Sequence, residues 1–219
     1  FMKGCRDLLS KSDDMPLAGF EEEIRSKSII LPPCLQIEEV FPEGERLRDG
    51  GPPVIVWNHR WEYDKDPEFF FNALYSLQSD GVPFRLIVLG ESFRHRPQIF
   101  AEAKKVLAER ILHFGYTPSR SEYLAWLNRA DIVVSTARHE FFGLSVLEAV
   151  RAGCCPLLPR RLVYPELFDD VFLYDDCNFD LRLRQFLTCP PADRHQTSRL
   201  AEQYSWPSLR SRYEAWLAL

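Results

Sequence analysis

From residue 54 onward, short apolar runs alternate with segments of helical periodicity. The runs lack polar alternation, which is typical of strands buried on both faces of a parallel sheet. Between them, apolar side chains recur every three or four residues, as in helices that cover such a sheet. The pattern predicts strands at Val54–Trp57, Phe84–Leu89, Ile111–Phe114, Asp131–Ser135, Cys155–Leu158 and Val171–Leu173. The predicted fold is therefore α/β, a doubly wound parallel sheet of the Rossmann-like kind.

Local signals place the helices between these strands. Asp66 followed by Pro67 is a capping residue with a proline in the first turn, which predicts a helix up to Gly81. Ser119 and Glu122 have the spacing of a capping box, which predicts the start of another helix. Further helices are predicted at 97–110 and 143–152, with two more at the end of the chain.

Residues 1–53 have a different character. Phe1–Lys11 is consistent with the end of a helix, and Ser28–Leu31 with a short strand stopped by two prolines. From Pro42 to Pro53 the chain is rich in Glu, Arg, Gly and Pro, as linkers are. The chain also lacks an initiator-like start. We therefore expect residues 1–53 to be the tail of a missing N-terminal domain plus a linker, and 54–219 to be a domain of its own.

The composition is that of a folded chain, with 219 residues of which 46% are apolar and 27% charged. No run approaches the ~18 consecutive apolar residues of a membrane helix, and no secretory signal is visible. The net charge of −5 argues against a domain held on nucleic acid mainly by counterion release, although a local basic site stays open.

The six cysteines show no metal-binding pattern, since the chain has no C-x-x-C and no histidine pair at zinc-finger spacing. The adjacent Cys154 and Cys155 are expected to be thiols of a buried strand rather than a redox pair. We therefore expect a reducing, cytoplasmic setting and no structural metal.

In a doubly wound sheet, ligands bind beyond the carboxyl ends of the strands, where the strand order reverses. The second and third strands end in glycines, which admit a ligand but also serve as plain turn residues. There is no G-x-G-x-x-G dinucleotide fingerprint. His113 is expected to be a histidine satisfied under a loop rather than a catalytic group. The loops at this edge are His59–Asp66, Gly90–Arg96, Gly115–Ser119 and Thr136–Gly143.

The first of these loops carries two cations, Arg60 and Lys65, five residues apart. At the mouth of a parallel sheet they could converge on one diphosphate, since arginine offers a planar fork and lysine a point charge. The alternative is an exposed polar turn in which the two cations pair with Glu62 and Asp64. The loop by itself does not decide between the two interpretations.

The fourth loop is the most informative. Glu140 lies in the loop, and Glu148 follows roughly two helical turns later. Between them, the backbone N–H groups of Phe142, Gly143 and Leu144 are expected to be free at a helix N-terminus, a site for an anion or a hydroxyl oxygen. The two carboxylates could then hold the hydroxyls of a sugar and of a ribose. The alternative is that both glutamates only cap and solubilise the helix.

Taken together, Arg60-x4-Lys65 and Glu140-x7-Glu148 with Phe142-Gly143 between them resemble the retaining glycosyltransferases of family 4. The resemblance runs from about Val54 to the end and is to the C-terminal, donor-binding half of the two-domain GT-B fold. A narrower likeness is to the tRNA-queuosine α-mannosyltransferases, which transfer mannose from GDP-mannose to queuosine in tRNA-Asp. The segments that carry it are His59–Glu62, Asp64–Glu68, Leu89–Phe93, His139–Gly143 and Leu162–Glu166.

The resemblance implies a role for each matching residue. Arg60 and Lys65 would hold the donor diphosphate and stabilise it as the leaving group, and Glu140 would hold hydroxyls of the hexose. Glu148 would accept hydrogen bonds from the ribose. The remaining donor-binding positions are implied near the base (Tyr116, Thr117), beside the donor (Gly90) and at backbone N–H groups (Phe142, Gly143, Leu144, Ser145).

The resemblance further implies a metal-independent enzyme that needs no cofactor besides a nucleotide-sugar donor, expected to be GDP-mannose. The tRNA acceptor would bind mainly through the missing N-terminal domain, so the isolated fragment is expected to be inactive. One departure is that Asp66-Pro67 follows Lys65, where family 4 more usually has glycine. The alternatives are a family 4 enzyme with another sugar and a glycan or lipid acceptor, or a module that binds a nucleotide sugar without turnover.

Overall fold

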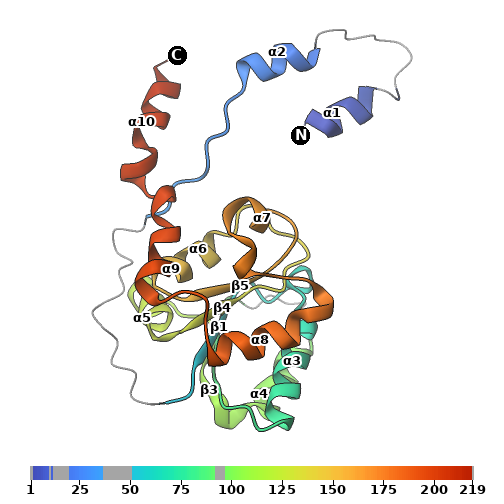
Figure 1. The fold of residues 1–219 in the computed structure, drawn as a ribbon, viewed down its shortest axis with the longest axis vertical. Coiled ribbons are helices and arrows are strands. Elements are labelled where there is room, and N and C mark those ends of the chain that lie inside the picture. Colours follow the sequence, from blue (N-terminus) through green and yellow to red (C-terminus); the bar gives the residue numbers. More distant parts are fainter. Residues whose placement is uncertain (1, 10, 12–19, 37–50, 92–96, 219) are drawn as a thin grey trace. The chain divides into compact units, whose positions relative to one another are not determined.

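The computed structural model describes residues 2–9, 11, 20–36, 51–91 and 97–218 (Figure 1). The chain divides into two compact units, Pro33–Ser211 and Phe1–Pro32 with Arg212–Leu219. The first unit contains the β-sheet and all the candidate site residues that the sequence suggests. In the described part of the chain, no helix is long and apolar enough to cross a membrane.

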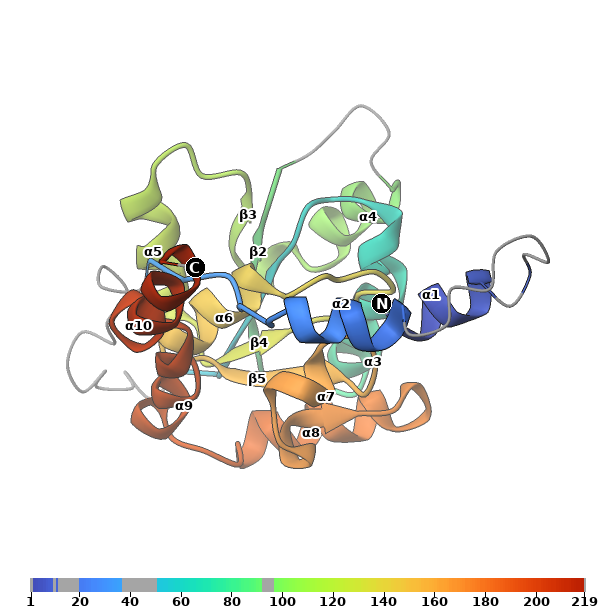
Figure 2. The same ribbon diagram turned by 90° about the horizontal axis from the view of Figure 1, so that it is seen from above.

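The sheet has six strands, all parallel, in the order β3-β2-β1-β4-β5-β6. Part of this order can be followed from β3 to β5 in Figure 2. The order reverses between β1 and β4, as in a doubly wound sheet, so the predicted α/β class is confirmed. The strands are β1 Val54–Asn58, β2 Arg85–Leu89, β3 Ile111–Gly115, β4 Ile132–Val134, β5 Cys155–Pro159 and β6 Leu173–Tyr174.

Helices cover both faces of the sheet in this unit (Figure 1). Helix α3 contacts α4 and α8 on one side, whereas α6 contacts α5 and α9 on the other. The α-helices are α3 Pro67–Ser79, α4 Ile99–Val106, α5 Arg120–Arg129, α6 Leu144–Arg151, α7 Tyr164–Leu167, α8 Phe179–Thr188, α9 Arg194–Leu200 and α10 Trp206–Leu217. Short 3₁₀ turns lie at η1 Tyr63–Lys65, η2 Ala108–Arg110, η3 Asp170–Phe172, η4 Asp176–Asn178 and η5 Glu202–Tyr204.

The predicted helix starts are confirmed. The Asp66 side chain accepts a hydrogen bond from the backbone N–H of Phe69, and Pro67 occupies the first turn of α3. At α5 the Ser119 hydroxyl accepts from the backbone N–H of Glu122 at 3.1 Å. These local bonds satisfy N–H groups that the first turn of a helix leaves free, which is why the sequence alone located them.

Some predictions for the less regular segments are wrong. Ser28–Leu31 forms no strand, and α2 (Phe20–Lys27) precedes it instead. Val171 belongs to the turn η3, so β6 begins only at Leu173. Three α-helices, not two, follow β6, and α7 was not predicted. These elements are short, and short elements carry too few residues for a periodic signal.

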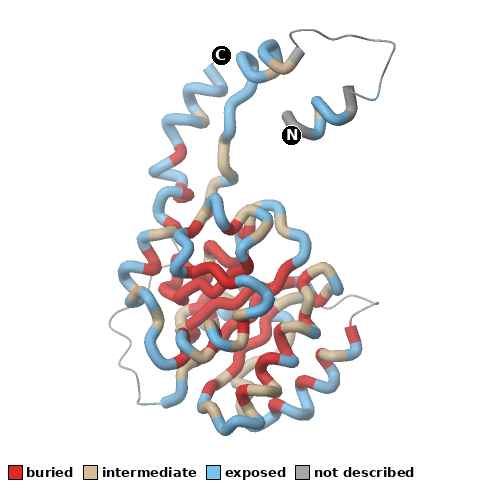
Figure 3. The backbone as a smooth tube through the Cα atoms, turned by 45° about the vertical axis from the view of Figure 1, so that its right-hand side comes forward, coloured by how far each residue is buried: buried red, intermediate tan, exposed pale blue. Residues whose placement is uncertain are grey.

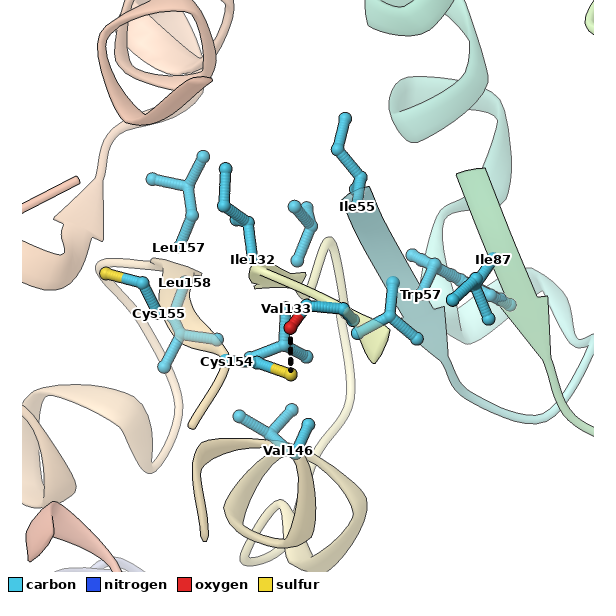
Figure 4. Close-up of a cluster of buried hydrophobic side chains, with 14 of the residues drawn as sticks. Ile55, Trp57, Ile87, Ile132, Val133, Val146, Cys154, Cys155, Leu157 and Leu158 are labelled. Carbon is cyan, nitrogen blue, oxygen red and sulfur yellow. Dashed lines mark hydrogen bonds between the residues drawn. The ribbon is translucent and has the colours of Figure 1, made fainter. Parts of the chain in front are cut away.

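The core consists of the strands and the inner faces of the helices, which Figure 3 shows as buried. Every residue of β1, β4 and β5 is buried, because both faces of these strands are covered. Cys154 and Cys155 are both buried and unbonded to each other, and their side chains point in different directions in Figure 4. The Cys154 thiol donates to the carbonyl oxygens of Leu127 and Ala130, as expected for a thiol of the core.

The smaller unit contains α1 (Met2–Leu9) and α2, joined by an ion pair between Arg6 and Glu21. In the C-terminal segment of this unit, Arg212 donates a hydrogen bond to the carbonyl oxygen of Ile30, and Tyr213 donates one to the carbonyl oxygen of Pro32. Most of the predicted linker, residues 42–50, lies outside the described residues. The domain boundary after residue 53 therefore stays a prediction.

Candidate functional site

The carboxyl ends of the parallel strands bring the predicted loops to one edge of the sheet. A cavity of about 340 Å³ opens there. Four of the residues expected to bind the donor line it together, namely Gly90, Tyr116, Thr117 and Glu148. They come from the ends of β2 and β3 and from α6, which are separate in sequence and meet because the sheet order brings them together.

Glu148 is held in place by two polar side chains, one of which is bonded in turn by a third. One carboxylate oxygen lies 2.7 Å from the Arg120 guanidinium, and the other accepts a hydrogen bond from the Tyr123 hydroxyl at 2.9 Å. Asn58 donates both to the Tyr123 oxygen and to the carbonyl of Ser145. Burial and the nearby Glu148 raise the pKa of Tyr123 well above its ordinary value, so the phenol keeps the proton that it donates. Glu148 thus presents a fixed carboxylate to the cavity.

Two strand-ending glycines border this edge, and the structure distinguishes them. Gly90 has φ 135°, and a Cβ there would come within 1.9 Å of the His59 carbonyl oxygen. Gly115 has φ 145°, but a Cβ there would meet nothing within 4 Å. The tight contact at Gly90 is with the loop that follows β1. The same two loops are also joined by a hydrogen bond from the Trp61 N–H to the Glu91 carbonyl at 3.0 Å.

Arg60 and Lys65 differ in their surroundings. The Arg60 side chain is 58% exposed and lies 3.2 Å from Glu62. The Lys65 side chain is only 8% exposed, with its Nζ 3.3 Å from Asp64 and 3.4 Å from Glu140. Both ion pairs of the polar-turn alternative are present, but Lys65 is buried rather than exposed as that alternative supposes. The loop folds inward, because the Thr136 hydroxyl donates to the Lys65 carbonyl at 2.8 Å and so joins the first and fourth loops.

Glu140 occupies the N-terminus of α6. Its Oε1 accepts hydrogen bonds from the backbone N–H groups of Phe141 and Gly143, at 3.0 and 3.1 Å. The expectation that the Gly143 N–H is free is therefore wrong, because this carboxylate already holds the place of an anion at the helix start. Gly143 has φ 80°, and a Cβ there would press on the Tyr164 ring at 3.1 Å.

The remaining candidates differ in exposure and contacts. Tyr116 and Leu144 are exposed, whereas Thr117 is buried. Phe142 packs edge-on against the ring of Tyr204, with 5.4 Å between the ring centroids. Ser145 contributes its carbonyl oxygen to Asn58, as described above, and its N–H belongs to the first turn of α6. These five candidates therefore lie around the start of α6 and the cavity.

His113 behaves as expected, since its Nε2 lies 3.1 Å from the Gly115 carbonyl oxygen and its ring packs on Trp126. Sequence reasoning missed the residues that fix Glu148, namely Asn58, Arg120 and Tyr123, and assigned no role to His59. Asn58 and His59 had a usable signal, because they are polar residues that directly follow the apolar run of β1. In the part of the chain that the structure describes, no group of three or more His, Cys, Asp or Glu could hold a metal ion.

Residues 43–203 match the model of the protein family described as glycosyl transferases group 1. The chain belongs to the group 1 glycosyl transferases. It is 33% identical over 215 residues to the tRNA-queuosine alpha-mannosyltransferase of Drosophila melanogaster, covering 94% of this chain and 56% of that protein. The chain therefore spans little more than half the length of this curated relative.

Two further proteins are similar to this chain, one in sequence and one in fold. The chain is 29% identical over 119 residues to the GDP-mannose:cellobiosyl-diphosphopolyprenol alpha-mannosyltransferase of Xanthomonas campestris, covering 52% of this chain and 30% of that protein. The C-terminal domain of a group 1 glycosyl transferase (LpcC) from Francisella tularensis has the same fold, with a TM-score of 0.55 and 18% identity. That match covers 84% of this chain and 96% of the LpcC domain.

Proposed function

We propose that this chain is the donor-binding part of a retaining glycosyltransferase that transfers mannose from GDP-mannose to queuosine in tRNA. The observation that carries the proposal is the cavity that joins Gly90, Tyr116, Thr117 and Glu148 at the carboxyl edge of the sheet. Mannose is supported by both the Drosophila and the Xanthomonas relatives, which are alpha-mannosyltransferases, GDP-mannose by the Xanthomonas relative, and queuosine in tRNA by the Drosophila relative. We place the reaction in the cytoplasm.

The nucleoside would lie in the cavity. In the proposed arrangement, Tyr116 and Thr117 border the base, and the Glu148 carboxylate accepts hydrogen bonds from the ribose hydroxyls. Arg120 and Tyr123 hold that carboxylate at 2.7 and 2.9 Å, so it is oriented before the ligand arrives. Such preorganisation lowers the cost of binding.

The diphosphate would bind between Arg60, Lys65 and the start of α6. Arg60 is exposed and free to turn from Glu62 to a ligand, because a surface ion pair contributes little. The charge that develops on the diphosphate as the glycosidic bond breaks would be stabilised by the two cations and by the helix N-terminus. The backbone N–H groups of Phe142, Leu144 and Ser145 would complete this anion site.

A bound hexose would replace some of the hydrogen bonds that the Glu140 carboxylate makes in the ligand-free molecule. In the ligand-free molecule this carboxylate binds the Lys65 ammonium and the N–H groups of Phe141 and Gly143. A diphosphate at the α6 start would take over these cationic and N–H partners and release Glu140 to accept from sugar hydroxyls. The tRNA would be held mainly by the rest of the full-length protein, since this chain has a net charge of −5.

The test is a transfer assay with the full-length protein, GDP-mannose, and tRNA-Asp with or without queuosine. A mass increase of one hexose on the queuosine form alone supports the proposal. Transfer to a lipid-linked glycan instead, with none to tRNA, would assign another acceptor and refute the queuosine proposal.

The two glutamates provide matched variants for the same protein. Glu148→Gln should weaken the binding of GDP and GDP-mannose alike, because both carry the ribose. Glu140→Gln should leave GDP binding nearly intact and lower kcat, because its contact is to the ring that distorts in the transition state. Glu109→Gln is the control, since Glu109 lies before β3, at the opposite edge of the sheet. Full turnover by Glu140→Gln would contradict its role.

A further inference from the structure

His59 lies where the strand order of the sheet reverses. It directly follows β1, and β1 pairs with β2 on one side and with β4 on the other. Its imidazole is hydrogen-bonded to the backbone of Val134, the last residue of β4. The residue therefore lies at the carboxyl ends of the neighbouring strands β1 and β4, where a doubly wound sheet binds its ligands.

One ring nitrogen of His59 has no hydrogen-bond partner among the described residues. Only 4% of the residue is exposed, and its Nε2 is buried without a hydrogen bond to any described residue. The bond to the Val134 backbone therefore belongs to Nδ1–H, which leaves Nε2 as an acceptor. Buried polar atoms are nearly always paired, so an unpaired acceptor in a candidate crevice points to a partner that the ligand supplies.

The charged groups that act electrostatically on this ring belong to the proposed donor site. Lys65 acts on the imidazole from the loop after β1, together with Asp64, and Glu140 acts on it from the loop before α6. Burial, with a further contribution from the Lys65 cation, lowers the pKa of His59 to about 4. The ring is therefore neutral near pH 7, and its Nε2 lone pair can accept a hydrogen bond.

We propose that His59 is a specificity-determining residue whose Nε2 accepts a hydrogen bond from a hydroxyl of the donor hexose. The inference rests on the proposed function. The hexose rather than the nucleoside is the partner, because the charge of Glu140, the proposed hexose ligand, acts on the ring, whereas the cavity beside Glu148 is lined by other residues. Since Nε2 is closed to solvent, the hydroxyl reaches it only when side chains around the ring move as the donor binds.

Two substitutions separate the two ring nitrogens. His59→Asn keeps a donor at the δ position and removes the ε acceptor, whereas His59→Gln places an amide oxygen near the ε position. Titration calorimetry of the 219-residue chain should show a Kd for GDP-mannose raised about three- to tenfold in His59→Asn, the scale of one neutral hydrogen bond. The Kd for GDP should stay unchanged, and His59→Gln should keep most of the preference for GDP-mannose.

His113→Asn is the matched control, because His113 lies within β3, two strands away from β1, and its ring nitrogen contacts the nearby Gly115 carbonyl. Equal losses for GDP and GDP-mannose in His59→Asn, or no loss for either, would overturn the hexose contact. Binding of neither ligand by the parent chain would instead defeat the proposed function itself, and this inference with it.

The unsubstituted protein gives a second measurement that does not depend on the stability of a variant. Long-range ¹H–¹⁵N spectra at pH 7 resolve the ring nitrogens of the five histidines. The Nε2 signal of His59 should move on addition of GDP-mannose and stay in place with GDP. An unmoved Nε2 signal at saturating GDP-mannose would overturn the proposal.

Discussion

The buried His59 makes the stability of this fold depend on pH. Its pKa is lowered from 6.5 to about 4, first by burial and then by the Lys65 cation. As the pH falls below 6.5, the unfolded chain binds a proton at this residue and the folded chain does not, so the unfolded state gains stability. The contribution of His59 to folding is therefore complete above pH 6.5 and is lost as the pH falls toward 4.

The magnitude follows from the size of the pKa shift. Since one pKa unit corresponds to 1.36 kcal/mol, the interval from 6.5 to about 4 amounts to about 3 kcal/mol of unfolding free energy. A fully buried ring needs no discount for screening by solvent. This is a large part of the roughly 5–15 kcal/mol that stabilises a typical domain.

Urea unfolding monitored by tryptophan fluorescence between pH 7 and 4.5 measures this effect. Carboxylates also titrate toward the acid end, so the informative quantity is the difference between the parent and His59→Gln. The parent should lose about 2–3 kcal/mol more than His59→Gln over this range. An identical pH dependence in the parent and His59→Gln would refute the reasoning.

Two paired substitutions test other features of the site. Gly90→Ala should destabilise the fold by at least about 3 kcal/mol more than Gly115→Ala, because both have positive φ but only the first collides with the His59 carbonyl; equal losses would contradict the collision. Lys65→Met should lower the free energy of unfolding by about 3 kcal/mol, because its carboxylate partners would lose their cation. Arg60→Met should lower the free energy of unfolding by under about 0.5 kcal/mol, because its ion pair is exposed. In titration calorimetry, each of these two variants should bind GDP more weakly by about 1.5–3 kcal/mol. Unchanged GDP affinity in both variants would show that the two cations do not bind the diphosphate.

The sequence predicted most of the sheet and the positions of its loops. Apolar runs such as Val54–Trp57 need only local information, because a strand covered on both faces has no polar alternation. The start of α3 at Pro67 and that of α5 after Ser119 were also set locally, by side chains that bond N–H groups three residues away. Short elements such as α7 and β6 carried no periodic signal and were missed or displaced.

The candidate site was only partly readable from the sequence. Glu140 and Glu148 stand out because of their spacing around the start of α6, and the strand-ending Gly90 could be found as a turn residue. That Gly90 avoids a collision with His59 could not be found, because the contact joins loops after two different strands. Likewise the local sequence made Lys65 look like an exposed cation, whereas the structure buries it.

By itself the sequence determined the α/β class, the edge of the sheet where the site lies and the residue types gathered there. These depend on periodicity and on caps a few residues long. Only the tertiary structure decided which charges pair and which polar atoms stay unpaired. The Lys65–Glu140 contact spans 75 residues and the Asn58–Ser145 bond 87. Such contacts exist only once β1 and β4 are neighbours, because the order of the strands, rather than the pattern of any one of them, brings their loops together.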